Sequence, residues 1–74
     1  MMIQEKNAKH KGIEIELNVK YLENGKWTSH YTLVEHTGPE TIVTHHYPNE
    51  EFETVDAARK FALEQARLTI ERKR

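Results

Sequence analysis

The stretch IEIELNVKY, residues 13–21, decides the fold of this chain. Apolar and polar residues alternate along it without a break, and successive side chains of a strand point to opposite faces of a sheet. The stretch therefore predicts a half-buried strand with one apolar face. That face needs a second layer of structure to cover it.

Turn signals predict two further strands after this one. Asn24-Gly25 predicts a hairpin, because both residues tolerate the positive φ that tight turns require. A second strand is expected over residues 27–36, until Gly38-Pro39 ends it, since proline cannot donate a ladder hydrogen bond. A third strand is expected over residues 41–47, before Pro48-Asn49.

The register of the first hairpin decides which residues face the core. A two-residue loop would place Tyr21 beside Thr28, whereas a three-residue loop with Gly25 in a left-handed bulge would place Tyr21 beside Trp27. A slip of one residue exchanges the two faces. We expect the second register, because it alone gathers the large apolar side chains on one face: Trp27, Tyr31, Leu33 and Ile42.

A C-terminal helix is expected from Val55 to about Arg72, with Thr54 as its N-cap. The segment contains no Gly or Pro and is rich in strong helix formers. Its apolar arc is wider than one sheet needs, and the surplus edge holds Leu63, Ala66 and Ile70. Residues 1–11 are expected to form a flexible arm. The fold class expected for residues 12–74 is a two-layer α+β domain, with a three-stranded antiparallel meander (β-β-β-α) packed on one helix.

Length and composition limit the possible functions. The chain has 74 residues, enough for one domain with a small core, so a partner surface could add stability. It has no Cys, which excludes disulfides and thiolate metal sites. No signal peptide or membrane-spanning stretch is visible, and we expect a cytoplasmic protein without membrane contact.

Neither an enzyme nor a metal or cofactor site is expected. His30, His36 and His45 share the outer face in the chosen register, but His46 points the other way, so adjacent histidines cannot chelate one ion. Ser29 is the only serine, and no glycine-rich phosphate loop is present. An acid–base group of Glu14, Glu16 and His30, or a pH-responsive role of the histidines, stays open.

The candidate interaction surface combines the outer face of the sheet with the surplus edge of the helix. Residues 13–53 hold eight acidic residues and two basic ones, which disfavours a phosphate backbone as the ligand of the sheet. The candidate residues are Lys20, Thr28, His30, Thr32, His45, Tyr47, Leu63, Ala66 and Ile70.

Two family resemblances bear on function. The chain resembles the arm-binding domain of phage-type integrases, a family that has three strands and a helix and contacts DNA with its sheet. The resemblance is carried by Gly25-Lys26-Trp27, Tyr31, Phe52-Glu53-Thr54 and Ala57-Ala58. The chain also resembles HlyU-type small bacterial proteins, a family of transcriptional activators. This resemblance is carried by Lys11-Gly12, Phe52 and Gln65-Ala66-Arg67.

The function expected from the sequence is that of a non-catalytic bacterial module that forms a homodimer or binds another protein. The alternative is a nucleic-acid-binding or transcription-associated domain. Such a domain would bind the nucleic acid with the outer face of its sheet. The phosphate backbone would be contacted by Lys9, Lys11 and residues 72–74.

Overall fold

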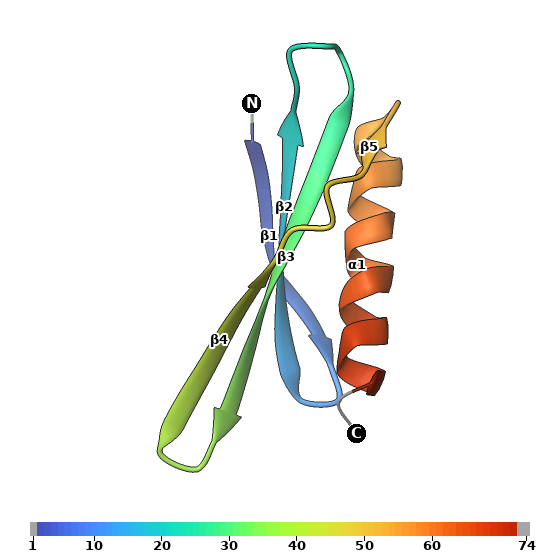
Figure 1. The fold of residues 1–74 in the computed structure, drawn as a ribbon. Helices are drawn as coiled ribbons and strands as arrows, with labels where there is room; N and C mark the ends of the chain where they lie inside the picture. Colours follow the sequence, from blue (N-terminus) through green and yellow to red (C-terminus); the bar gives the residue numbers. More distant parts are fainter. Residues whose placement is uncertain (1, 73–74) are drawn as a thin grey trace.

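A computed structural model describes residues 2–72 as five strands followed by one helix (Figure 1). The strands form one antiparallel sheet in the order β1-β2-β3-β4, and the short β5 pairs with β3 beyond the end of β4. The helix packs mainly on β2 and β3, on one face of the sheet. The elements are β1 (Met2–His10), β2 (Ile13–Tyr21), β3 (Trp27–Thr37), β4 (Glu40–His46), β5 (Glu51–Phe52) and α1 (Val55–Arg72).

The expected α+β architecture, an antiparallel sheet with a single C-terminal helix, is confirmed, but the three-stranded meander and the N-terminal arm are wrong. Residues 2–10 form β1, which pairs along β2. The turn between them is the two-residue Lys11-Gly12, where φ is 51° and 80°. Positive φ at both positions matches the twist of the flanking strands and permits a tight hairpin.

The expected register of the second hairpin is confirmed. Tyr21 pairs with Trp27, Leu17 with Tyr31 and Ile15 with Leu33. Gly25 has a φ of 84°, and the Leu22 amide donates to the Lys26 carbonyl at 2.8 Å, which closes the three-residue loop. The apolar face of β2 therefore faces α1, as the alternation predicts.

The core lies between α1 and the middle of the sheet. Ile13, Ile15, Leu17, Tyr31 and Leu33 from the strands pack against Ala62, Ala66 and Ile70 of the helix. Because alanine side chains are short, they let the helix approach the sheet closely. The helix begins as predicted at Val55, where Thr54 Oγ1 accepts a hydrogen bond from the Ala57 amide at 3.1 Å.

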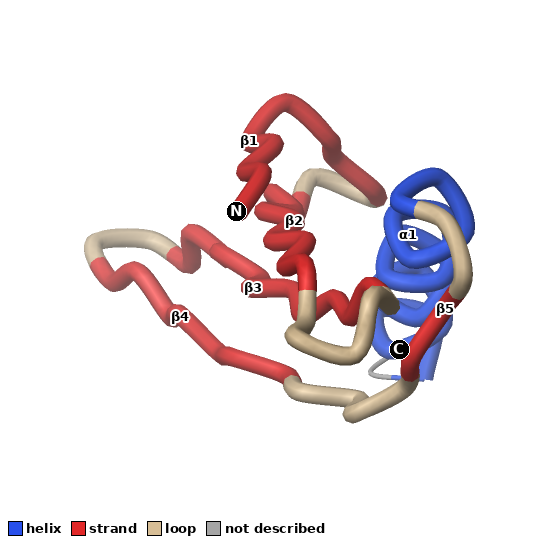
Figure 2. Tube along the Cα trace, turned by 90° about the horizontal axis from the view of Figure 1, so that it is seen from above, coloured by secondary structure: helices blue, strands red, loops and turns tan. Residues whose placement is uncertain are grey.

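The hairpin of β3 and β4 extends away from the helix. Figures 1 and 2 show its turn, around Gly38 and Pro39, at the end of the molecule far from α1. Ile42 pairs with Glu35 and so lies on the same face as Leu33, as predicted. However, α1 does not cover it, and Ile42 is 44% exposed. The expectation that Ile42 joins the core is therefore wrong.

Candidate interaction surface

The sheet face opposite α1, here called the outer face, carries the predicted sheet residues. Lys20 pairs with Thr28 and Thr32 with His45, and none of these points towards the helix. The Tyr47 ring lies 4.9 Å from the His30 ring. The sequence therefore places all six side chains on the correct face: Lys20, Thr28, His30, Thr32, His45 and Tyr47.

Thr32 is on the outer face but is not available to a partner. Its side chain lies at the centre of the sheet, only 5% of the residue is exposed, and Thr32 Oγ1 lies 2.9 Å from His45 Nδ1. This hydrogen bond satisfies a polar group that burial would otherwise penalise. The expectation that Thr32 contacts a ligand is corrected, whereas His45 remains exposed.

Burial and positive neighbours disfavour the charged form of His30. Partial burial lowers the pKa of its imidazole below the ordinary value, and the nearby His45 and Lys20 lower it further. His30 is therefore neutral over more of the pH range than a free histidine. The His30 and Tyr47 rings therefore form an aromatic pair on the outer face, with the charged side chain of Lys20 nearby.

Three further polar side chains of the outer face contact one another near the start of β2. His36 Nε2 lies 3.1 Å from Glu14 Oε2, and His36 Nδ1 lies 3.2 Å from Thr41 Oγ1. Across residues 2–72, no three of the His, Asp and Glu side chains gather closely enough to hold a metal ion.

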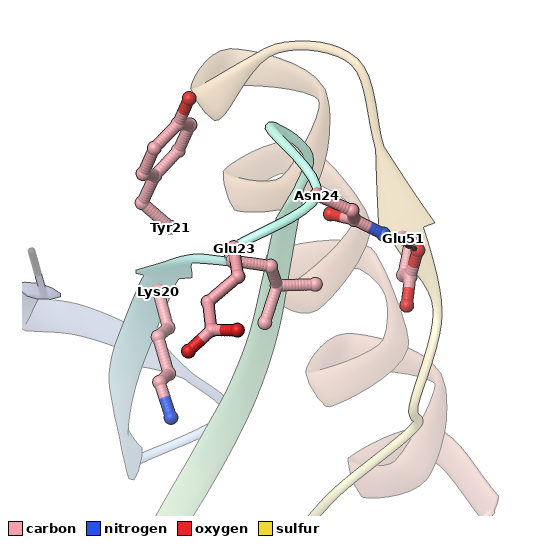
Figure 3. Close-up of a pocket in the computed structure, with 6 residues that line it drawn as sticks. Lys20, Tyr21, Glu23, Asn24 and Glu51 are labelled. Carbon is pink, nitrogen blue, oxygen red and sulfur yellow. Dashed lines mark hydrogen bonds between the residues drawn. The ribbon is translucent and has the colours of Figure 1, made fainter.

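A surface hollow at the β2–β3 hairpin is lined by mostly exposed polar side chains. Figure 3 shows Lys20, Tyr21 and Glu23 along one side and Asn24 turned towards Glu51. Asn24 Nδ2 donates to Glu51 Oε1 at 3.0 Å, which ties the hairpin to β5. The groups around the hollow are open to water, so they are not shielded in the way that a catalytic site requires.

The predicted surplus edge of the helix is wrong. Ala66 and Ile70 are completely buried in the core between α1 and the sheet, and Leu63 packs against the same core. Together with Ala58 and Ala62, the two residues form the buried stripe of α1. The four buried residues are spaced four apart along the helix, so they lie on the single stripe of α1 that packs on the sheet.

β4 exposes an apolar side chain on each face of the sheet. Ile42 on the helix-facing side is 44% exposed, and Val43 on the outer side is 49% exposed. In the part of the chain that the structure describes, β4 has β3 on one side and no strand on the other along its length. We call this unpaired backbone edge of Glu40–His46 the β4 edge.

The two-residue turn of the β3–β4 hairpin determines which residues point to the β4 edge. Such a turn closes on a pair that exchanges both backbone hydrogen bonds, here Thr37 and Glu40. Because these pairs alternate along an antiparallel ladder, every second residue of β4 directs its backbone groups away from β3. The N–H and C=O groups that face the β4 edge therefore belong to Thr41, Val43 and His45.

The opposite edge strand, β1, is built differently. Its pairing with β2 is interrupted by a bulge between Glu5 and Ala8. Arg59 Nε of the helix donates to Glu5 Oε2, and Glu71 of the helix contacts both His10 and Lys11 at 2.7 Å. Bulges and charged side chains are the usual means by which proteins prevent pairing at a sheet edge.

Sequence reasoning did not identify the β4 edge as a candidate site. The signal was present in residues 41–47, TIVTHHY, which hold β-branched and aromatic residues and no Lys, Arg, Asp or Glu. Such a composition is typical of a strand with a neighbour on each side. Only the topology shows that one of these neighbours is missing.

Comparison with protein-family models, with curated proteins and with solved structures gives no significant match. Among residues 2–72, the single helix is too polar to cross a membrane.

Proposed function

We propose that the protein is a non-catalytic interaction module that binds another polypeptide by adding a strand to the β4 edge. The observation that carries this proposal is the exposure of Ile42 and Val43 on opposite faces of a strand with one unpaired side. An added strand would satisfy the backbone groups of Thr41, Val43 and His45. It would also cover both apolar side chains, a combination that strand-addition complexes use.

The contrast with β1 supports the choice of edge. A strand added to β1 would meet an irregular ladder at the bulge and the charged side chains of Lys6 and Lys9. A strand added to β4 would instead extend a regular ladder, because β3 and β4 pair without a break. Their pairing runs from Tyr31 with His46 to Thr37 with Glu40.

The nucleic-acid alternative has weaker support. The exposed Tyr47 ring could stack on a base. However, Glu14 and Glu16 lie on the outer face beside Val34 and Thr32, where they would repel a phosphate backbone. Of the basic tail proposed for phosphate contacts, Lys73 and Arg74 lie outside the described residues.

A synthetic peptide with the sequence of residues 40–47 tests the proposal. Titrated into isotope-labelled protein, it should shift the backbone amide resonances of Thr41, Val43 and His45 most strongly. A peptide with the same sequence, N-methylated at alternate residues so that it cannot pair, is the control. Shifts confined to the outer face around His30, or no shifts at all, would contradict the proposal.

Two protein variants locate the binding edge. Val43→Pro removes an N–H that faces the β4 edge and leaves the ladder to β3 intact, so peptide binding should be lost. Met2→Lys changes a side chain on β1 that is 50% exposed, nearly the same as Val43, and binding should be unchanged.

A further inference from the structure

We infer that the strand added to the β4 edge is β4 of a second copy of this chain, antiparallel and centred on Val43. The inference rests on the proposed function, because it names the occupant of the same edge. It makes the protein a symmetric dimer with one continuous sheet running through both copies.

Symmetry restricts the possible registers. Two copies that continue one sheet are related by a two-fold axis normal to the sheet, which keeps each face of one copy next to the same face of the other. Side chains alternate between faces, so one residue of β4 must lie directly opposite its own symmetry mate, with the axis midway between the two. Val43 is the middle residue of Glu40–His46, and an axis there lets all seven residues pair.

The backbone pattern agrees with this centre. Val43 directs its N–H and C=O to the β4 edge, so it can exchange two hydrogen bonds with Val43 of the partner subunit. Thr41 can do the same with His45 of the partner subunit, and His45 with Thr41 of the partner subunit. Every backbone group at the β4 edge is then paired, which matters because buried unpaired groups are costly.

The side chains are complementary on both faces. On the outer face, the two Val43 side chains meet at the axis, where β-branched pairs pack well. On the helix-facing side, Ile42 lies opposite Thr44 of the partner subunit. Glu40, the only acidic or basic residue of β4 other than histidine, lies opposite His46 of the partner subunit. No like charges meet, and an apolar centre has polar ends, as protein interfaces commonly have.

Single cysteines test the register, because the natural chain has none. In the inferred dimer, residue 43 lies about 5.5 Å in Cα distance from its symmetry mate, within the range of about 4.4–6.8 Å that a disulfide requires. Residue 41 lies four residues along the strand from its mate, or about 14 Å at 3.4 Å per residue. Both positions are exposed in the single chain.

Val43→Cys should therefore form a disulfide-linked dimer at least about tenfold faster than Thr41→Cys under mild oxidation. An equimolar mixture of Thr41→Cys and His45→Cys should give the mixed dimer, since these positions face each other. In concentrated urea the rates should become equal. Equal rates for Val43→Cys and Thr41→Cys in native buffer would overturn the inference.

Sedimentation of the unmodified chain separates this inference from the proposed function. A concentration-dependent monomer–dimer equilibrium that Val43→Pro abolishes and Met2→Lys preserves supports the dimer. A chain that is monomeric at every concentration but binds the peptide of residues 40–47 overturns the dimer and leaves strand addition standing. A monomeric chain that does not bind the peptide overturns both.

Discussion

The two edge strands of the sheet, β1 and β4, are exposed in different ways. β1 is interrupted by a bulge and fastened to α1 through Glu5 and His10. β4 pairs regularly with β3 along its whole length, extends beyond the helix, and exposes Ile42 and Val43. A regular edge whose only acidic or basic residue besides histidine is the terminal Glu40 is a template for another strand, and an irregular edge with several charged residues is not. The difference indicates which side of the sheet is suited to association.

Two isoleucines on the same face of the sheet differ in their burial, which shows that the β3–β4 hairpin extends beyond the core. Ile15 on β2 is completely buried, whereas Ile42 on β4 is 44% exposed. Ile15→Ala should lower the free energy of unfolding by about 2–5 kcal/mol, because it leaves a cavity under the helix. Ile42→Ala should change it by less than about 0.5 kcal/mol in dilute protein. Urea denaturation at low concentration measures both, and similar losses would show that β4 belongs to the core.

Lysine substitutions on β1 and β4 test which of the two edge strands takes part in dimer formation. Val43→Lys places two like charges beside each other on the two-fold axis of the inferred dimer. The dissociation constant should rise by at least about tenfold, equivalent to about 1.4 kcal/mol. Met2→Lys, at a similarly exposed position of β1, should leave it unchanged. A similar loss in both variants, measured by sedimentation, would contradict the difference between the edges.

The N-cap of α1 stabilises the helix-covered part of the molecule and not the β4 edge. Thr54→Ala removes the acceptor of the Ala57 amide and should cost about 1 kcal/mol of stability. Thr54→Ser keeps the hydroxyl and serves as the control. Thermal unfolding of the three proteins at one concentration gives the difference, and the dimer dissociation constant should not change while the chain is folded.

The smallest expected effect comes from the contacts that fasten β1 to α1. Hydrogen bonds from Lys11 and His10 lower the pKa of the Glu71 carboxyl below its ordinary value. A carboxyl with a lowered pKa contributes stability above its unfolded-state pKa, and this contribution is lost as the pH falls through the folded-state value. Stability should therefore decrease slightly on acidification, and Glu71→Gln should flatten this part of the profile. An identical profile in the variant would show that the contact does not stabilise the fold.

The sequence predicts the parts of the fold that rest on strong local patterns. The strict alternation after Ile13 predicts β2 with both of its bounds, and Asn24-Gly25 sets the register against β3. Thr54 predicts the start of the helix at Val55. Each of these features depends on neighbours within a few residues along the chain.

The parts that the sequence does not predict depend on distant contacts. β1 lacks alternation because its bulge shifts the pairing between Glu5 and Ala8, and its helix-facing residues include Glu5 and His10, which contact the helix instead of an apolar core. Ala66 and Ile70 are buried because they continue the stripe of Ala58 and Ala62 that faces the sheet, and the helix pattern alone does not show which part of its apolar arc faces the sheet. The sequence found the outer face, but the β4 edge required knowledge of which strand lacks a neighbour.

Amide hydrogen exchange at the β4 edge, measured as a function of protein concentration, tests the central claim most directly. If β4 pairs with β4 of a second copy, the amides of Thr41, Val43 and His45 should become protected as the concentration rises. The amides of β1 that face away from β2 should exchange at the same rate throughout. Fast exchange of Thr41, Val43 and His45 at every concentration would contradict the account.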